Sequence, residues 1–134
     1  MKTEIIKEFV KAVNDNDWGN VEEYLHESYT FRLIRHDMTL DKDEWMALAQ
    51  LMMEDTEHNI DIIKIIDLGR YSFAHNRINF IENGQVIGRL EECNLIEWAK
   101  NKFLSLETYA EVMVKSEITQ EWLKSFDMYS DKNN

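Results

Sequence analysis

Four strand-like segments follow one another in the second half of the sequence, with only two or three residues between them. They cover roughly residues 58–68, 71–82, 85–98 and 102–114, and the first of them is dense in β-branched side chains (IDIIKII). Connections this short join successive strands as antiparallel hairpins. The sequence therefore predicts an antiparallel meander of four long strands as the main part of the sheet.

Helices and one further strand are expected before the meander. Residues 3–14 place apolar side chains at helical spacing, and the segment NDND ends this helix and caps a second, short helix that starts near Trp18. Residues 28–35 alternate in character with a period of two, which is typical of a strand. The segment LDKDEW predicts the start of a third helix, because Asp41 and Glu44 have the spacing of a capping box.

A last short helix is expected after Ser116, and residues 128–134 are expected to form a frayed tail. The predicted order is ααβαββββ with a possible C-terminal helix. This order indicates an α+β fold with helices on one face of a long antiparallel sheet. At 134 residues, the length indicates one domain that spans residues 1–134.

Composition limits the kinds of partner. The formal net charge of -11 repels phosphate backbones and anionic membrane surfaces, so we expect neither nucleic acid nor a membrane as a partner. With one cysteine, no long apolar run at the start and no run of eighteen apolar residues, the expected setting is the cytoplasm. The four histidines lack metal-ligand spacing and no phosphate-binding glycine loop occurs, so no metal or cofactor is expected.

The dipeptide Asn83-Gly84 sets an expected register for the central hairpin. It favours a two-residue type I′ turn, which would place His75 opposite Glu92. The face with more aromatic mass is then assigned to the interior, and it carries Tyr71, Phe73, His75, Arg77, Leu90, Glu92 and Asn94. The opposite face would carry Ala74, Asn76, Ile78, Phe80, Ile87, Glu91 and Leu95. A one-residue bulge would exchange the two faces beyond it.

On this register His75, Arg77, Glu92 and Asn94 form a polar cluster inside an apolar interior. The cluster has two interpretations: a structural ion pair at one end of the sheet, or the wall of a pocket. For the last hairpin, a three-residue loop would set Thr108 opposite Asn94 and bury Leu104, Leu106, Ala110 and Val112. A two-residue loop would bury Ser105, Glu107, Tyr109 and Glu111 instead. We prefer the first, because it buries the more apolar set.

A family resemblance runs through most of the chain. The segments FVKAVNDNDWGNVEEYL, SYTFRL and NGQVIGRLEECNLIEW, the last running into FLSLETYAEV, resemble the nuclear transport factor 2-like superfamily. That superfamily includes SnoaL-like polyketide cyclases and ketosteroid isomerases. The resemblance implies a strongly curved, cone-shaped sheet that the N-terminal helices close around a ligand cavity, and frequent dimerisation through the outer face of the sheet.

The residues of the ketosteroid isomerase mechanism do not carry over. The resemblance places its tyrosine oxyanion donor at Phe9 and its aspartate base near Leu33, and neither side chain can move a proton. Only its second oxyanion-hole acid has a polar counterpart, at Asn94. The resemblance therefore argues against that isomerase mechanism in this chain.

Three functions are considered. The first is binding of a small, mostly apolar ligand in an internal cavity; the second is a lyase, isomerase, cyclase or hydrolase that uses His75 and Glu92 as an acid–base pair; the third is a dimeric interaction module with a filled cavity. The apolar outer-face residues Ile78, Phe80, Ile87 and Leu95 favour a homodimer in all three cases. The predicted ligand contacts are Phe9, Trp18, Phe31, Leu33, Phe73, Arg77, Asn94, Leu106 and Thr108.

Overall fold

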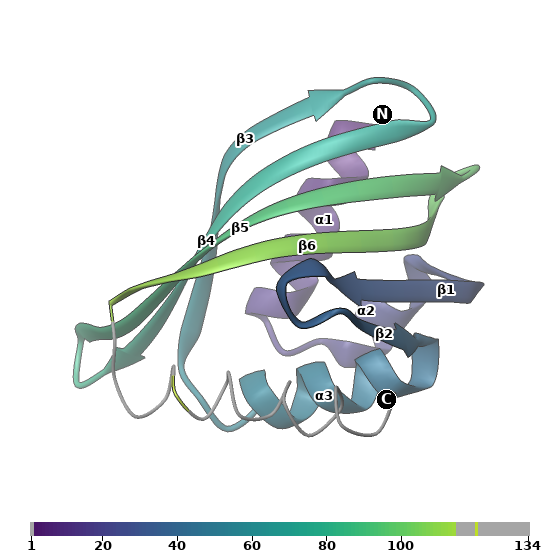
Figure 1. The fold of residues 1–134 in the computed structure, drawn as a ribbon. Helices are drawn as coiled ribbons and strands as arrows, with labels where there is room; N and C mark the ends of the chain where they lie inside the picture. Colours follow the sequence, from purple (N-terminus) through teal and green to yellow (C-terminus); the bar gives the residue numbers. More distant parts are fainter. Residues whose placement is uncertain (1, 115–119, 121–134) are drawn as a thin grey trace.

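The computed structural model describes residues 2–114 and residue 120, and it consists of helices packed against one curved sheet (Figure 1). The helices are α1 (Lys2–Asn14), α2 (Trp18–Glu23) and α3 (Lys42–Met53), with a short 3-10 turn η1 (Ile34–His36). The strands are β1 (Leu25–Leu33), β2 (Met38–Asp41), β3 (His58–Asp67), β4 (Tyr71–Glu82), β5 (Gln85–Ala99) and β6 (Lys102–Val114). The helix expected after Ser116 and the tail expected at 128–134 lie outside the described residues.

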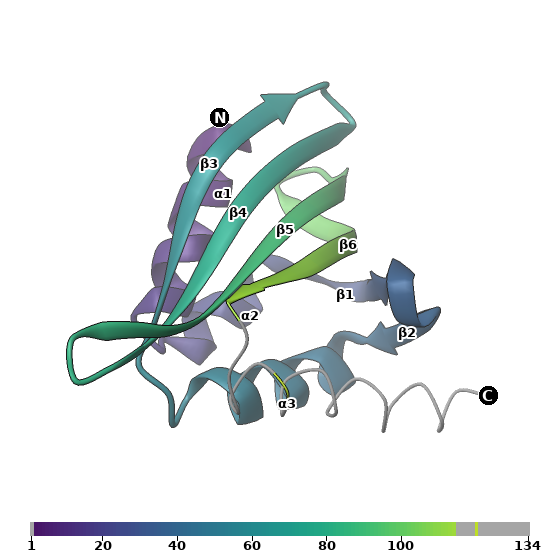
Figure 2. The same ribbon diagram turned by 60° about the vertical axis from the view of Figure 1, so that its left-hand side comes forward.

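The sheet has the strand order β2-β1-β6-β5-β4-β3. The four-strand antiparallel meander is confirmed, and the helices lie against one side of the curved sheet, as Figure 2 shows from a second direction. One pairing departs from the antiparallel arrangement that we expected, because β1 runs parallel to β6. Strand β2 was not expected; it pairs with β1 over only four residues, a length too short for a periodic signal.

Local capping and side-chain bonds fix the helices. The capping box at the start of α3 is confirmed: Glu44 N donates to Asp41 Oδ1 at 2.8 Å, and Asp41 N donates to Glu44 Oε1 at 3.1 Å. Helix α1 is fastened to β3 through Asn14, whose Nδ2 donates to Ile60 O and whose Oδ1 accepts from Ile60 N. His58 adds a second link, with Nε2 2.9 Å from Val13 O.

A bulge in the central hairpin decides which face each β4 residue occupies. Next to the turn the pairing is as expected, with Glu82 opposite Gln85, but the register shifts between Phe80 and Ile81. Beyond this shift, the even-numbered β4 residues Ser72, Ala74, Asn76, Ile78 and Phe80 are buried, and Asn79 is buried as well. The predicted faces of β4 are therefore wrong, whereas the predicted inner residues of β5 are correct, with Leu90 and Asn94 buried.

The last hairpin contains a second bulge. Ala99 pairs with Lys102, so the loop has two residues and not the three that we expected. A register shift between Glu97 and Trp98 compensates, and Asn94 still faces Thr108 as predicted. Leu106, Ala110 and Val112 accordingly pack in or against the core, but Phe103 takes the buried place that we expected for Leu104.

Candidate functional site

A pocket of about 120 Å³ lies between the three helices and the sheet. Most of its lining side chains are apolar or aromatic, and its carboxyl, amide and hydroxyl groups come from Asn76, Glu92, Asn94 and Thr108. Among the described residues no lysine, arginine or histidine lines it. The pocket wall includes these predicted site residues: Phe9, Trp18, Phe31, Leu33, Glu92, Asn94, Leu106 and Thr108.

An aromatic cluster forms one part of the wall. Trp45 on α3 stacks with Phe9 on α1 at a ring-centroid distance of 6.2 Å, and its ring lies 6.4 Å from that of Phe31 on β1. Tyr29 meets the edge of Trp45 at 5.7 Å, and Phe103 lies 4.8 Å from Phe9. Offset and edge contacts of this kind stabilise the position of each ring, so the cluster gives the pocket a defined apolar surface.

The polar groups of the pocket sit together on three neighbouring strands. Asn94 Nδ2 donates to Ala74 O at 3.3 Å, and Thr108 Oγ1 donates to Asn94 Oδ1 at 2.8 Å, so Asn94 is held by both adjacent strands. Asn76 lies opposite Glu92 in the β4–β5 pairing, and its Oδ1 is buried without a hydrogen-bond partner among the described residues. Buried polar atoms normally have partners, so this atom marks a place where a bound molecule could supply one.

Among the described residues that line the pocket, Glu92 is the one with an ionisable side chain. Burial raises the pKa of its carboxyl from the ordinary 4.5 to about 7, while a hydrogen bond with Asn94 acts in the opposite direction. Burial, followed by the negative charge of Glu92, also raises the pKa of Tyr29 well above its usual value. Near neutral pH the Glu92 carboxyl can therefore both hold and release a proton.

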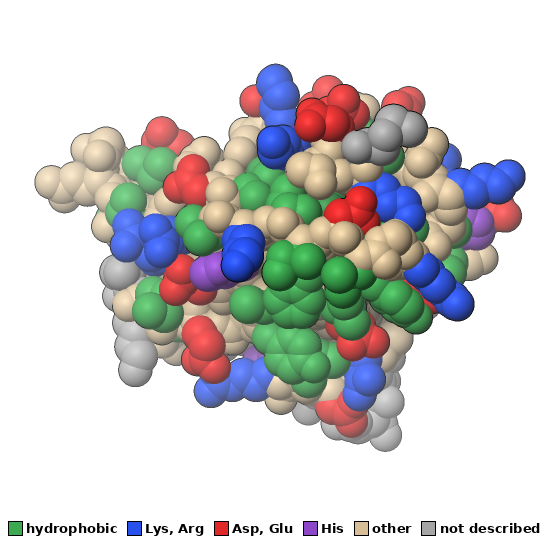
Figure 3. All heavy atoms as spheres, turned by 90° about the horizontal axis from the view of Figure 1, so that it is seen from above, with side chains coloured by type: hydrophobic (Ala, Val, Ile, Leu, Met, Phe, Trp, Pro, Cys, Tyr) green, Lys and Arg blue, Asp and Glu red, His purple; other side chains and the backbone are tan. Residues whose placement is uncertain are grey.

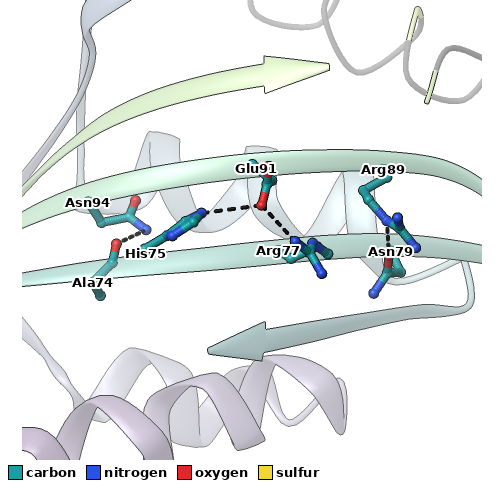
Figure 4. Close-up of polar contacts among 7 residues, drawn as sticks. All are labelled: Ala74, His75, Arg77, Asn79, Arg89, Glu91 and Asn94. Atoms are coloured by element: carbon teal, nitrogen blue, oxygen red, sulfur yellow. Dashed lines mark hydrogen bonds and ion pairs between the residues drawn. The ribbon is translucent and has the colours of Figure 1, made fainter. Parts of the chain in front are cut away.

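His75 and Arg77 are not in the pocket, contrary to the prediction. They lie on the opposite face of β4, where Glu91 Oε1 is 3.3 Å from His75 Nε2 and 3.0 Å from Arg77 Nη2 (Figure 4). The hydrogen bond from Arg77 and the nearby positive charges lower the pKa of Glu91. The predicted pairing of His75 with Glu92 is wrong, because the bulge shifts the partner of each β4 residue by one position.

The same shift moves Phe73 to the outer face, where 36% of it is exposed, and brings Ile78 and Phe80 into the core. Ile78 and Phe80 therefore leave the expected set of outer-face apolar residues, whereas Leu95 lies on the outer face as predicted. Its neighbours across β4 and β3 are Phe73 and Ile66. Seen from above, the molecule shows a group of apolar side chains bordered by charged ones (Figure 3).

Sequence reasoning missed two parts of the pocket. One is Asn76, which belongs to the β4 face that carries Ala74, Ile78 and Phe80. The apolar residues at alternate positions of this face were a signal for burial. We nevertheless assigned the opposite face to the interior, because it has more aromatic side chains. The other is the lining side of α3, represented by Trp45 and Leu48. The spacing of these residues predicted a helix without showing what its apolar side would face.

In the part of the chain that the structure describes, no three His, Cys, Asp or Glu side chains come together as a group that could hold a metal ion. No helix there is long and apolar enough to span a membrane.

Comparisons with known proteins identify the fold. No protein-family model matches the sequence, and no curated protein matches it either. Similar solved structures include a SnoaL-like polyketide cyclase, described as putative, from Shewanella denitrificans, with a TM-score of 0.70 and 12% identity over 92% of this chain and 97% of that one.

Two other solved structures are similar to the same degree. An LEH-like epoxide hydrolase from M. tuberculosis has a TM-score of 0.67 and 12% identity over 96% of this chain and 90% of that one. A nuclear transport factor 2-like protein of unknown function from Cytophaga hutchinsonii has a TM-score of 0.64 and 20% identity over 83% of this chain and 90% of that one. This chain therefore has the nuclear transport factor 2-like fold.

Proposed function

We propose that the protein binds a small, mostly apolar molecule in the pocket. The observation that carries this proposal is the composition of the pocket lining: an apolar and aromatic surface with a few polar groups gathered on neighbouring strands. Pockets for small molecules commonly combine a broad apolar surface with a few polar groups that fix the orientation of the ligand. The apolar body of the ligand would contact the aromatic cluster, and its polar group would face Glu92 and Asn76.

The pocket has features that a filled core would lack. Protein interiors are packed with few voids larger than a water molecule, whereas this pocket measures about 120 Å³. Two buried polar atoms at the pocket, Asn76 Oδ1 and Trp18 Nε1, have no hydrogen-bond partner among the described residues. These features favour a ligand-binding pocket over a filled interaction module.

A proton-transfer enzyme is the second candidate, and the raised pKa of Glu92 is the observation that favours it. A carboxyl with a pKa near 7 can act as a general acid or base at neutral pH. Because His75 lies on the other face, Glu92 would act without the histidine partner that we first expected. Observation of the Glu92 carboxyl by NMR tests this candidate: a titration midpoint near 4.5 would contradict an acid–base role at neutral pH.

The binding proposal is tested with propylbenzene, a neutral apolar probe, by calorimetry or ligand-observed NMR. Ala49 and Ala47 both lie on α3, but Ala49 lines the pocket and Ala47 is exposed. We expect saturable binding to the wild type and to Ala47→Phe, and loss of binding in Ala49→Phe, because the added ring fills the pocket. Circular dichroism verifies that both variants fold.

Two results would contradict the proposal. One is the absence of propylbenzene binding by the wild type. The other is equal binding by a folded Ala49→Phe variant, which would place the probe somewhere other than this pocket.

A further inference from the structure

We infer that the pocket selects ligands with a protonated amine on an apolar body, and that the ammonium group pairs with the carboxylate of Glu92. This inference rests on the proposed function and names the class of ligand. It follows from the charge, hydrogen-bonding and aromatic groups around Glu92.

The charge of the pocket is unbalanced. Of the described residues that line the pocket, Glu92 alone is ionisable and none carries a positive charge. A buried carboxylate without a cation is costly, and its ordinary solutions are protonation or pairing with a positive charge. Glu92 shows the first solution, since burial raises its pKa to about 7. A ligand ammonium would supply the second.

The hydrogen-bonding groups favour a donor on the ligand. Beside Glu92, the buried Oδ1 of Asn76 is an acceptor without a partner. On β5 and β6 the donors next to Glu92 are already engaged: Thr108 Oγ1 donates to Asn94 Oδ1, and Asn94 Nδ2 donates to Ala74 O. The unpartnered donor of the pocket, Trp18 Nε1, belongs to α2 and not to these strands. An ammonium group has donors only, so it complements a carboxylate and an amide oxygen. A ligand carboxylate would instead meet a like charge.

The aromatic cluster adjoins the acid. Tyr29 connects the two, since its ring lies 5.7 Å from Trp45 and the negative charge of Glu92 helps to raise the pKa of its hydroxyl. Trp45, Phe9 and Phe31 all line the pocket. Cations are attracted to the faces of aromatic rings, with tryptophan the strongest. A ligand whose ammonium group pairs with Glu92 would therefore also contact these aromatic rings favourably.

The charge of the whole chain acts in the same direction. A formal net charge of -11 attracts cations and repels anions at a distance. This long-range effect is weaker than the pairing inside the pocket because salt screens it. Together, the two effects disfavour phosphate- and carboxylate-bearing ligands and favour cationic ones.

The test uses four probes of similar apolar body: 2-phenylethylamine, 2-phenylethanol, 3-phenylpropanoate and propylbenzene. Calorimetry on the full chain at pH 8 should show that the amine binds tighter than the alcohol by about tenfold or more, since charged hydrogen bonds are stronger than neutral ones. Amine affinity should rise by about 30-fold from pH 5.5 to pH 8, because Glu92 ionises over this range while the amine stays charged.

A matched pair of variants locates the effect. Glu92→Gln keeps the size of the side chain but removes its charge, so it should abolish both the amine preference and the pH dependence of amine binding. Glu91→Gln, on the opposite face of the same strand, should leave both unchanged, because Glu91 contacts His75 and Arg77 outside the pocket.

The outcomes separate this inference from the proposed function. If propylbenzene binds but the amine does not, or if the alcohol binds as tightly as the amine at pH 8, the inference is wrong and the binding function stands. The inference is also wrong if Glu92→Gln keeps the pH dependence of amine binding. If none of the four probes binds, both proposals fail.

Discussion

Replacing Glu92 with glutamine should stabilise the protein at alkaline pH and change its stability little near pH 4.5. The cause is the environment of the carboxyl, because burial raises its pKa from 4.5 to about 7. Between these two pH values the folded protein keeps the Glu92 proton while the unfolded chain has lost it. The free energy of unfolding of the wild type therefore falls as the pH rises through this window.

The magnitude follows from the size of the shift. One pKa unit corresponds to about 1.4 kcal/mol, so a shift from 4.5 to about 7 removes about 3 kcal/mol of stability by pH 8. Glutamine has a similar shape and no proton to lose, so it does not undergo this loss. The stability of Glu92→Gln relative to the wild type should consequently increase by about 3 kcal/mol between pH 4.5 and pH 8.

The assay is urea unfolding followed by tryptophan fluorescence at several pH values from 4.5 to 8. Glu91→Gln serves as the control, because the pKa of Glu91 is lowered by Arg77 and His75 on the outer face. Its carboxylate stabilises the fold at every pH above its ordinary pKa, so this variant should be less stable than the wild type, without a gain that grows with pH. A stability difference for Glu92→Gln that stays flat or narrows with pH would refute the burial of this carboxyl and the pocket geometry built on it.

Three further predictions concern packing, the Asn94 bonds and assembly. Trp18→Ala should lower the free energy of unfolding by about 3 kcal/mol or more, because Trp18 is 6% exposed; a loss below about 1 kcal/mol in urea unfolding would place this side chain at the surface. Asn94→Ala should lower the free energy of unfolding by about 2 kcal/mol in the same assay, because it leaves the buried Thr108 hydroxyl without its acceptor. An unchanged free energy of unfolding would contradict this prediction. We expect a homodimer formed through the outer face around Phe73, 36% of which is exposed. Light scattering should then give twice the 16.0 kDa chain mass and Phe73→Glu should give the monomer, whereas a 16.0 kDa wild-type particle at micromolar concentration would contradict the dimer.

The elements of this fold could be read from the sequence because their signals are local. The NG turn and the strand-like segments around it predicted β4 over residues 71–82, and the structure has it at Tyr71–Glu82. The capping box of Asp41 and Glu44 likewise fixed the start of α3. Turn chemistry, capping and hydrophobic periodicity depend on neighbouring residues, so they need no knowledge of the rest of the chain.

The faces of the strands were decided by the tertiary structure. Side chains alternate along a strand with a period of two, so one inserted residue reverses every assignment beyond it. The bulge near Phe80 exchanged the faces of β4, which brought His75 within 3.3 Å of Glu91 on the outer face and placed Asn76 opposite Glu92. The second bulge restored the predicted Asn94–Thr108 pair despite a shorter loop. No local pattern in the sequence indicated the position of either bulge, because that position depends on the curvature of the whole sheet.

The pocket also depends on contacts between distant segments. The sequence predicted that Glu92 and Asn94 lie on the inner face of β5, but not that α3 from the middle of the chain would contribute to the pocket wall. Likewise, β1 pairs in parallel with β6, although more than sixty residues separate the two strands. Apart from β2, the sequence by itself therefore determined the helices and strands described above, and with them the residues available for the site. The tertiary structure determined which of them meet, because burial and pairing across the sheet depend on the packing of the whole chain.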